Sequence, residues 1–137
     1  MKKYIKIVFA VLALSFIWTA CKKDYPVDED GLLITQRAEC SVSSFEIVGS
    51  DFVSVRTLNK AAIIDTTAQT IAVEVRFSTD LKNLYPQFTL VSDAKLDPKI
   101  VGKVDFSDLA NPKVYTVVSG NRQVRKPYKI LLTVQPR

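Results

Sequence analysis

The chain of 137 residues contains no histidine, and this absence excludes several classes of catalytic and metal site. Serine and cysteine hydrolases of the triad type need an imidazole base, and many zinc sites need imidazole ligands. With only four glycines, the chain carries neither a phosphate-binding loop nor a dinucleotide-binding motif. One small domain also offers little room for a deep cleft. The sequence therefore predicts a protein that is not an enzyme and has no cofactor and no resident metal.

Only one long apolar run occurs, from Ile7 to Ile17, and it follows three lysines in the first six residues. The run is too short to cross a hydrocarbon core of about 30 Å as a helix. A basic start, a short apolar stretch and small residues at the cleavage point are typical of a secretory signal. We therefore expect residues 1–20 to be a signal peptide.

The end of this segment, Thr19-Ala20-Cys21, resembles the lipobox of bacterial lipoproteins, although Trp18 replaces the usual aliphatic residue. The resemblance implies that Cys21 is lipidated and becomes the anchored N-terminus of a membrane-attached protein. Cleavage there removes three lysines and lowers the formal net charge from +5 to +2. Cys40 is then left without a disulfide partner, and we expect it to be a small buried side chain.

Residues 21–33 are predicted to be the lipidated cysteine and a flexible tether. They are charged, contain Pro26 and Gly31 and show no apolar periodicity. The acidic run at residues 28–30 lacks the spaced oxygen ligands and closing glutamate of a calcium loop, so we interpret it as a solvated spacer. Residues 22–24 resemble a variant of the surface-display signal of Bacteroidota. The resemblance implies an outer-membrane protein exposed at the cell surface, with a periplasm-facing orientation as the alternative.

Residues 34–137 have the length of one domain, and their apolar residues alternate with polar ones. Alternation with a period of two indicates strands that are buried on one face. The clearest runs lie at residues 43–48, 70–77, 87–91 and 128–135, with a β-branched run at 114–119 and weaker runs at 53–55 and 61–65. Residues 65–69 and 119–122 have the composition of turns between strands.

Six or seven short strands without a long helix predict an all-β fold, an immunoglobulin-like antiparallel β-sandwich. A closed barrel is the alternative architecture. Residues 79–84 and 105–109 each begin with a capping-type residue and precede a proline, so we expect one or two single-turn helices in the connections. Their apolar side chains are expected to close one end of the core; they are Leu81, Leu84, Phe106 and Leu109.

The segments 79–86, 105–107, 115–121 and 128–134 together resemble a set of Bacteroides-type surface lipoproteins with a single immunoglobulin-like domain of unknown function. The resemblance extends from about Ile34 to Val134. It implies the sandwich fold and a role in glycan handling or as a scaffold at the cell surface. It supplies no catalytic residues.

Binding candidates come from exposed aromatic and basic side chains. Tyr85, beside a proline at a connection, is the best candidate for an exposed ring, and Phe52 is the next. Near the last hairpin, Arg122, Arg125 and Lys126 form a local basic group that suits an anionic glycan, or that protects a sheet edge from aggregation. Nucleic acid is not an expected partner of an exported lipoprotein.

These features predict a non-enzymatic lipoprotein of the cell envelope that acts as a surface binding or accessory module, with glycan capture as the first hypothesis. The alternative is a structural spacer, or a subunit of an envelope complex, that contacts only protein. An aromatic ring exposed beside polar groups favours glycan capture, whereas a flat apolar patch or an uncovered strand edge favours the spacer.

Overall fold

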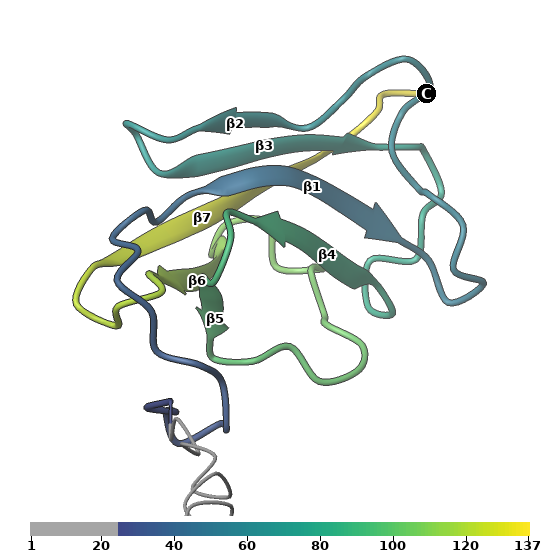
Figure 1. The fold of residues 1–137 in the computed structure, drawn as a ribbon. Helices are drawn as coiled ribbons and strands as arrows, with labels where there is room; N and C mark the ends of the chain where they lie inside the picture. Colours follow the sequence, from purple (N-terminus) through teal and green to yellow (C-terminus); the bar gives the residue numbers. More distant parts are fainter. Residues whose placement is uncertain (1–24) are drawn as a thin grey trace, which may run out of the picture.

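The computed structural model describes residues 25–137; the predicted signal peptide and Cys21 lie outside the described residues. Seven strands make up the fold (Figure 1), and no helix occurs among the described residues. The strands are β1 (Val42–Val48), β2 (Ile63–Asp65), β3 (Thr70–Val75), β4 (Tyr85–Leu90), β5 (Lys95–Asp97), β6 (Lys113–Val118) and β7 (Arg125–Val134).

The strands form two sheets, which confirms the predicted sandwich and not the closed barrel. One sheet pairs β1 with β4, and the other has the order β2-β3-β7-β6-β5. In Figure 1 the small sheet lies across one face of the larger one. The pairs are antiparallel apart from β3 and β7, which run parallel in register from Thr70 beside Lys129 to Val75 beside Val134.

The core lies between the two sheets and follows from the alternation of the strands. Ile71, Val73 and Val75 of β3 are buried, and the residues between them are only partly buried. Aromatic rings join the two sheets, because Phe88 of β4 makes an edge contact with Tyr115 of β6 at a centroid distance of 5.5 Å. Burial of these apolar side chains is the main stabilising contribution to such a fold.

The connections at residues 79–84 and 105–109 contain turns and extended backbone, so the predicted helical turns are wrong. Their aspartates bond to backbone two residues ahead: Asp80 accepts a hydrogen bond from the Lys82 amide, and Asp105 accepts one from Ser107. Such turns compete locally with helix formation. The same segments still close the core, since Leu84 and Phe106 are buried and Leu81 packs against the core, whereas Leu109 is exposed.

Residues 25–34, which we call the strap, differ from the flexible tether expected from sequence. Val27 and Leu33 form an antiparallel bridge, and the Ile34 amide donates to the carbonyl of Pro26 at 2.8 Å. The Thr35 amide then donates to the carbonyl of Gly120, in the turn between β6 and β7. The strap is therefore a closed hairpin-like loop that is bonded to the sandwich.

No helix of residues 25–137 is long and apolar enough to cross a bilayer.

Candidate functional site

The turn after β1 projects Phe52 into solvent. The Phe52 amide donates to the carbonyl of Gly49 at 3.0 Å, and the Asp51 carboxylate accepts a hydrogen bond from the Val53 amide at 3.1 Å. Phe52 has a φ of 59°, a left-handed conformation that is uncommon for a residue with a side chain. The residue is 68% exposed. A large apolar ring is thus held in solvent by a turn that imposes an unfavourable backbone conformation.

Tyr85 supports this ring from the neighbouring strand. It is the first residue of β4 and pairs with Val48, the last residue of β1, so the turn and the strand start are adjacent. The Phe52 and Tyr85 rings stack with their centroids 4.9 Å apart and an interplanar angle of 26°. Phe52 and Tyr85 form what we call the aromatic platform. The two aromatic candidates from sequence are therefore brought together, with Phe52 rather than Tyr85 as the more exposed ring.

A surface hollow of about 370 Å³ is lined by residues that flank both members of the platform. Its charged and aromatic lining consists of Asp51, Arg76, Phe77 and Asp80, and Asn83 is one of its neutral polar residues. The Asp80 carboxylate accepts a hydrogen bond from the Asn83 amide group at 2.7 Å, and this bond holds the pKa of Asp80 below its usual value. The hollow therefore combines a charged acceptor, the Asp80 carboxylate, with the apolar ring of Phe77. It lies close to the two rings of the aromatic platform.

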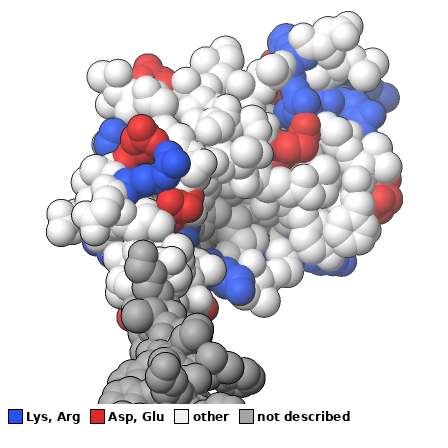
Figure 2. Space-filling view, viewed as in Figure 1, with Lys and Arg blue, Asp and Glu red and all other residues white. Residues whose placement is uncertain are grey.

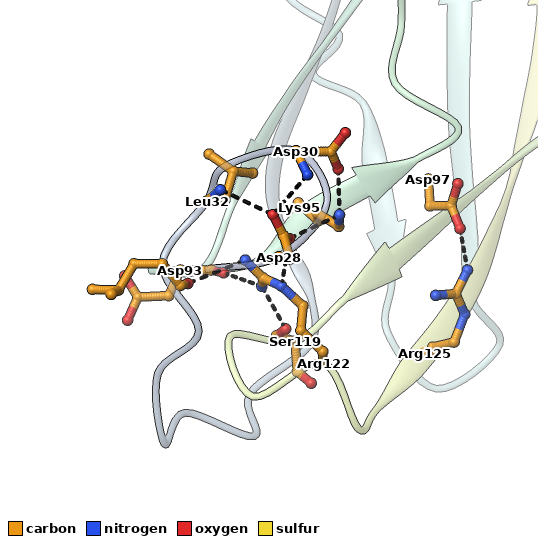
Figure 3. Close-up of polar contacts among 10 residues, drawn as sticks. Asp28, Asp30, Leu32, Asp93, Lys95, Asp97, Ser119, Arg122 and Arg125 are labelled. Atoms are coloured by element: carbon orange, nitrogen blue, oxygen red, sulfur yellow. Dashed lines mark hydrogen bonds and ion pairs between the residues drawn. The ribbon is translucent and has the colours of Figure 1, made fainter. Parts of the chain in front are cut away.

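The three basic candidates do not join this platform. Arg122 lies in the turn before β7, where its Nε donates to the Asp28 carboxylate at 2.8 Å. Arg125 forms an ion pair with Asp97 of β5, apart from the Arg122 contacts (Figure 3). Lys126 is half-buried within β7. These basic groups thus lie in separate surroundings, and two of them are held by acidic partners.

The surface view agrees with this pairing of charges. On the face shown in Figure 2, acidic and basic side chains gather in mixed clusters with wide uncharged areas between them. No group of three histidine, cysteine, aspartate or glutamate residues within residues 25–137 is placed to hold a metal ion. The aspartates after β4 and in the following loops accept hydrogen bonds within turns or form ion pairs with arginines.

Asp28 joins the strap to the sandwich, a role that its sequence context did not suggest (Figure 3). One carboxylate oxygen accepts hydrogen bonds from the Asp30 and Leu32 amides, and the other contacts Lys95 at 2.9 Å and Arg122 at 2.8 Å. The side chain of Asp28 is only 9% exposed. The hydrogen bond from Lys95 is the largest cause that lowers the pKa of Asp28 well below the ordinary aspartate value.

Arg122 completes the connection between strap and sandwich. Its guanidinium also donates to the carbonyls of Leu33, Asp93 and Ser119. One side chain thereby links the strap, the loop after β4 and the turn after β6. A basic residue near a glycine turn gives no sequence signal for this role, because its acidic partner is 94 positions earlier in the chain.

Cys40 is buried as predicted, and its thiol donates to the carbonyl of Val117 at 3.0 Å. Burial raises the pKa of this thiol, which keeps it protonated and weakly reactive.

The two-sheet topology defines the class of protein: an immunoglobulin-like β-sandwich domain. Within this class, the sequence also matches a known family. Residues 50–131 match the family model described as "SGBP, N-terminal", and the chain belongs to that family. The matched segment begins within the turn of Phe52 and ends within β7. No curated protein matches the chain.

Two solved structures from Bacteroides are similar over most of this chain. A protein of Bacteroides thetaiotaomicron VPI-5482, provisionally named a glycoside hydrolase, has a TM-score of 0.58 and 26% identity, covering 73% of this chain and 26% of its own. A DUF4623 family protein of Bacteroides eggerthii DSM 20697 has a TM-score of 0.52 and 18% identity, covering 72% and 22%. This chain thus spans about a quarter of either protein. Together with the family, these matches support the resemblance to Bacteroides-type proteins.

Proposed function

We propose that the protein is a non-catalytic, lipid-anchored accessory module at the bacterial outer surface, and that its aromatic platform contacts glycan. The family supports this function, since SGBP proteins are glycan-binding. The single structural observation that carries the proposal is the stacked pair of Phe52 and Tyr85 at the exposed end of the small sheet. Anchoring would occur through the predicted lipid on Cys21.

The chemistry of the platform suits a sugar ring. A pyranose presents a face of C–H groups, which packs against an aromatic ring, and a rim of hydroxyls, which need hydrogen-bond partners. The exposed face of Phe52 supplies the apolar surface, and the Tyr85 hydroxyl is a polar group at its side. The Asp80 carboxylate in the adjoining hollow supplies acceptors for sugar hydroxyls.

The position of the platform also suits capture of a ligand outside the cell. Val48 and Tyr85 pair at one end of the small sheet, and Val42 and Leu90 pair at the other. The strap is bonded near the second end, where Asp28 contacts Lys95 beyond β4 and Arg122 joins Leu33 of the strap to the carbonyl of Asp93. A strand of seven residues spans roughly 20 Å, so the platform lies that far or farther from the anchored end.

Affinity electrophoresis in polysaccharide-containing gels tests this function on the mature protein. We expect retardation by at least one glycan, and a loss of affinity of about tenfold in Phe52→Ala, because ring contacts contribute roughly 0.5–1.5 kcal/mol beyond buried area. Tyr85→Ala should also weaken binding because it removes the support of the Phe52 ring. Leu58→Ala is the matched control, since Leu58 is an exposed apolar residue outside the platform. Equal retardation of the unaltered protein and the three variants would show that the platform is not part of the glycan-binding surface.

A structural spacer is the second candidate function, and the network around Asp28 favours it. A domain bonded firmly to its own anchoring segment keeps a more fixed position relative to its anchor than a domain on a free tether. Folded protein that binds no glycan in the same gels would favour this spacer function.

A further inference from the structure

The strap presents apolar side chains away from the sandwich. Side chains on adjacent positions of an extended ribbon point to opposite sides, and Asp28 points toward Lys95 and Arg122 of the sandwich. Its neighbour Val27 and the bridge partner Leu33 therefore point outward, with Tyr25 on the same side as Val27. These three residues are what we call the outward face. Tyr25 and Val27 are 61% and 57% exposed.

The length of chain before the strap determines what can cover this face. Four residue steps separate Cys21 from Tyr25, and a chain extends at most about 3.6 Å per residue. A lipid on Cys21 would therefore hold Tyr25 within about 14 Å of the headgroup layer. Because Asp28 bonds the strap to the sandwich, the strap and the sandwich are held near the membrane together as long as these contacts persist.

We propose that the outward face of the strap rests in the interfacial layer of the lipid bilayer and fixes how the sandwich stands on the membrane. This inference rests on the proposed anchoring at Cys21 but not on glycan binding. A tyrosine with two aliphatic side chains suits that layer, since aromatic rings with a polar tip concentrate at membrane interfaces. The lipid anchor supplies the attachment, and the outward face supplies the orientation.

Single tryptophan reporters test the contact, because the mature chain has no tryptophan once Trp18 is removed with the signal. Lipidated Tyr25→Trp protein is reconstituted into phosphatidylcholine vesicles, with and without phosphatidylcholine brominated near the headgroup end of its acyl chains. We expect blue-shifted emission that the brominated lipid quenches. Leu58→Trp is the matched control: Leu58 is 77% exposed, and its loop is bonded to Glu74 near the far end of β3. Its emission should stay red-shifted and unquenched.

A second variant tests the apolar contact itself. In the Tyr25→Trp background, the changes Val27→Ser and Leu33→Ser remove the apolar groups at exposed positions, so the fold should persist. We expect the blue shift and most of the quenching to disappear although the protein still floats with the vesicles. An unquenched Tyr25→Trp protein that floats would overturn the membrane contact and leave the anchor intact. Failure to float would overturn the anchor and this inference together, while the glycan gels would still report on the platform independently.

Discussion

Asp28 carries a larger structural role than any other residue of the strap. Both of its oxygens are used, one by two backbone amides and the other by Lys95 and Arg122. Because the side chain is nearly buried, removal of its charge would leave two cationic groups without this partner. The loss of one member of such a network is costlier than the loss of an exposed ion pair.

Asp28→Asn should therefore open the strap while the sandwich stays folded. The amide side chain keeps the shape but loses the charge that attracts Lys95 and Arg122. We expect faster amide hydrogen exchange at Leu32 and Ile34, whose amides are bonded within the strap, and unchanged exchange in the core strands. Asp30→Asn is the control, because Asp30 is more exposed and its ion pair is with Lys95 alone. Equal effects of the two changes would contradict the central role of Asp28.

The pH dependence of the strap follows from the direction of the pKa shift. Folding lowers the pKa of Asp28, so its ionised form stabilises the closed strap at any pH above the ordinary aspartate value of about 3.9. This stabilisation declines as the pH falls below the ordinary value and is gone once the pH is below the lower pKa of the folded state. Exchange at Leu32, corrected for its intrinsic pH dependence, should show constant protection from about pH 7 to pH 5 and weaker protection in strong acid. Loss of protection near pH 6 would contradict this assignment.

Among the strands, β7 shows how the alternating sequence determines burial. Tyr128, Ile130 and Leu132 are buried, whereas Leu131 between them is exposed at the surface. β7 also lies between β3 and β6, so its inward residues contact the middle of the core.

Ile130→Ala and Leu131→Ala should consequently differ in their effect on the free energy of unfolding. Truncation of the buried Ile130 removes apolar contacts and leaves a cavity, for a loss of about 2–5 kcal/mol. The same truncation at Leu131 should change the free energy by less than about 1 kcal/mol. Urea unfolding followed by circular dichroism measures both. Similar losses at the two positions would indicate that the outer face of β7 is covered.

Strands with several alternating apolar residues were predictable from the sequence, and a weaker run predicted β2, whereas β5 was not predicted. β1, β3 and β7 each contain at least two buried residues at a spacing of two. β5 has only three residues, with Leu96 as its one apolar member, and it forms because β6 offers a partner edge. Pairing with a neighbouring strand in the folded protein produces no alternation of apolar and polar residues in the sequence.

The candidate site was partly predictable for a similar reason. An aromatic ring beside a turn or a proline indicates a surface position, which suggested Phe52 and Tyr85 separately. Their stacking depends on the pairing of β1 with β4, a contact across more than thirty residues. The interaction of Asp28 with Arg122 spans 94 residues and follows no local pattern, so the strap was interpreted as a tether.

For the molecule as a whole, the two ends of the sandwich have different surfaces. The end that carries the strap has outward apolar groups next to the predicted anchor, and the other end carries the aromatic platform. In Figure 1 the strap and the C-terminus also lie at opposite corners of the sandwich. This polarity suits a module that stands on a membrane and faces outward, whether its outer end binds glycan or supports another protein.

Cysteine labelling on intact cells tests this orientation, and the chemistry of the chain makes the background low. Cys21 is predicted to be acylated, and Cys40 is buried with a raised pKa, so a membrane-impermeant maleimide should not react with the unaltered protein. Leu58→Cys should be labelled on intact cells. Val27→Cys should be labelled only after detergent solubilisation, because the bilayer covers it. Labelling of Leu58→Cys only after the outer membrane is permeabilised would indicate a periplasm-facing protein, and equal labelling of both variants on intact cells would place the strap away from the membrane.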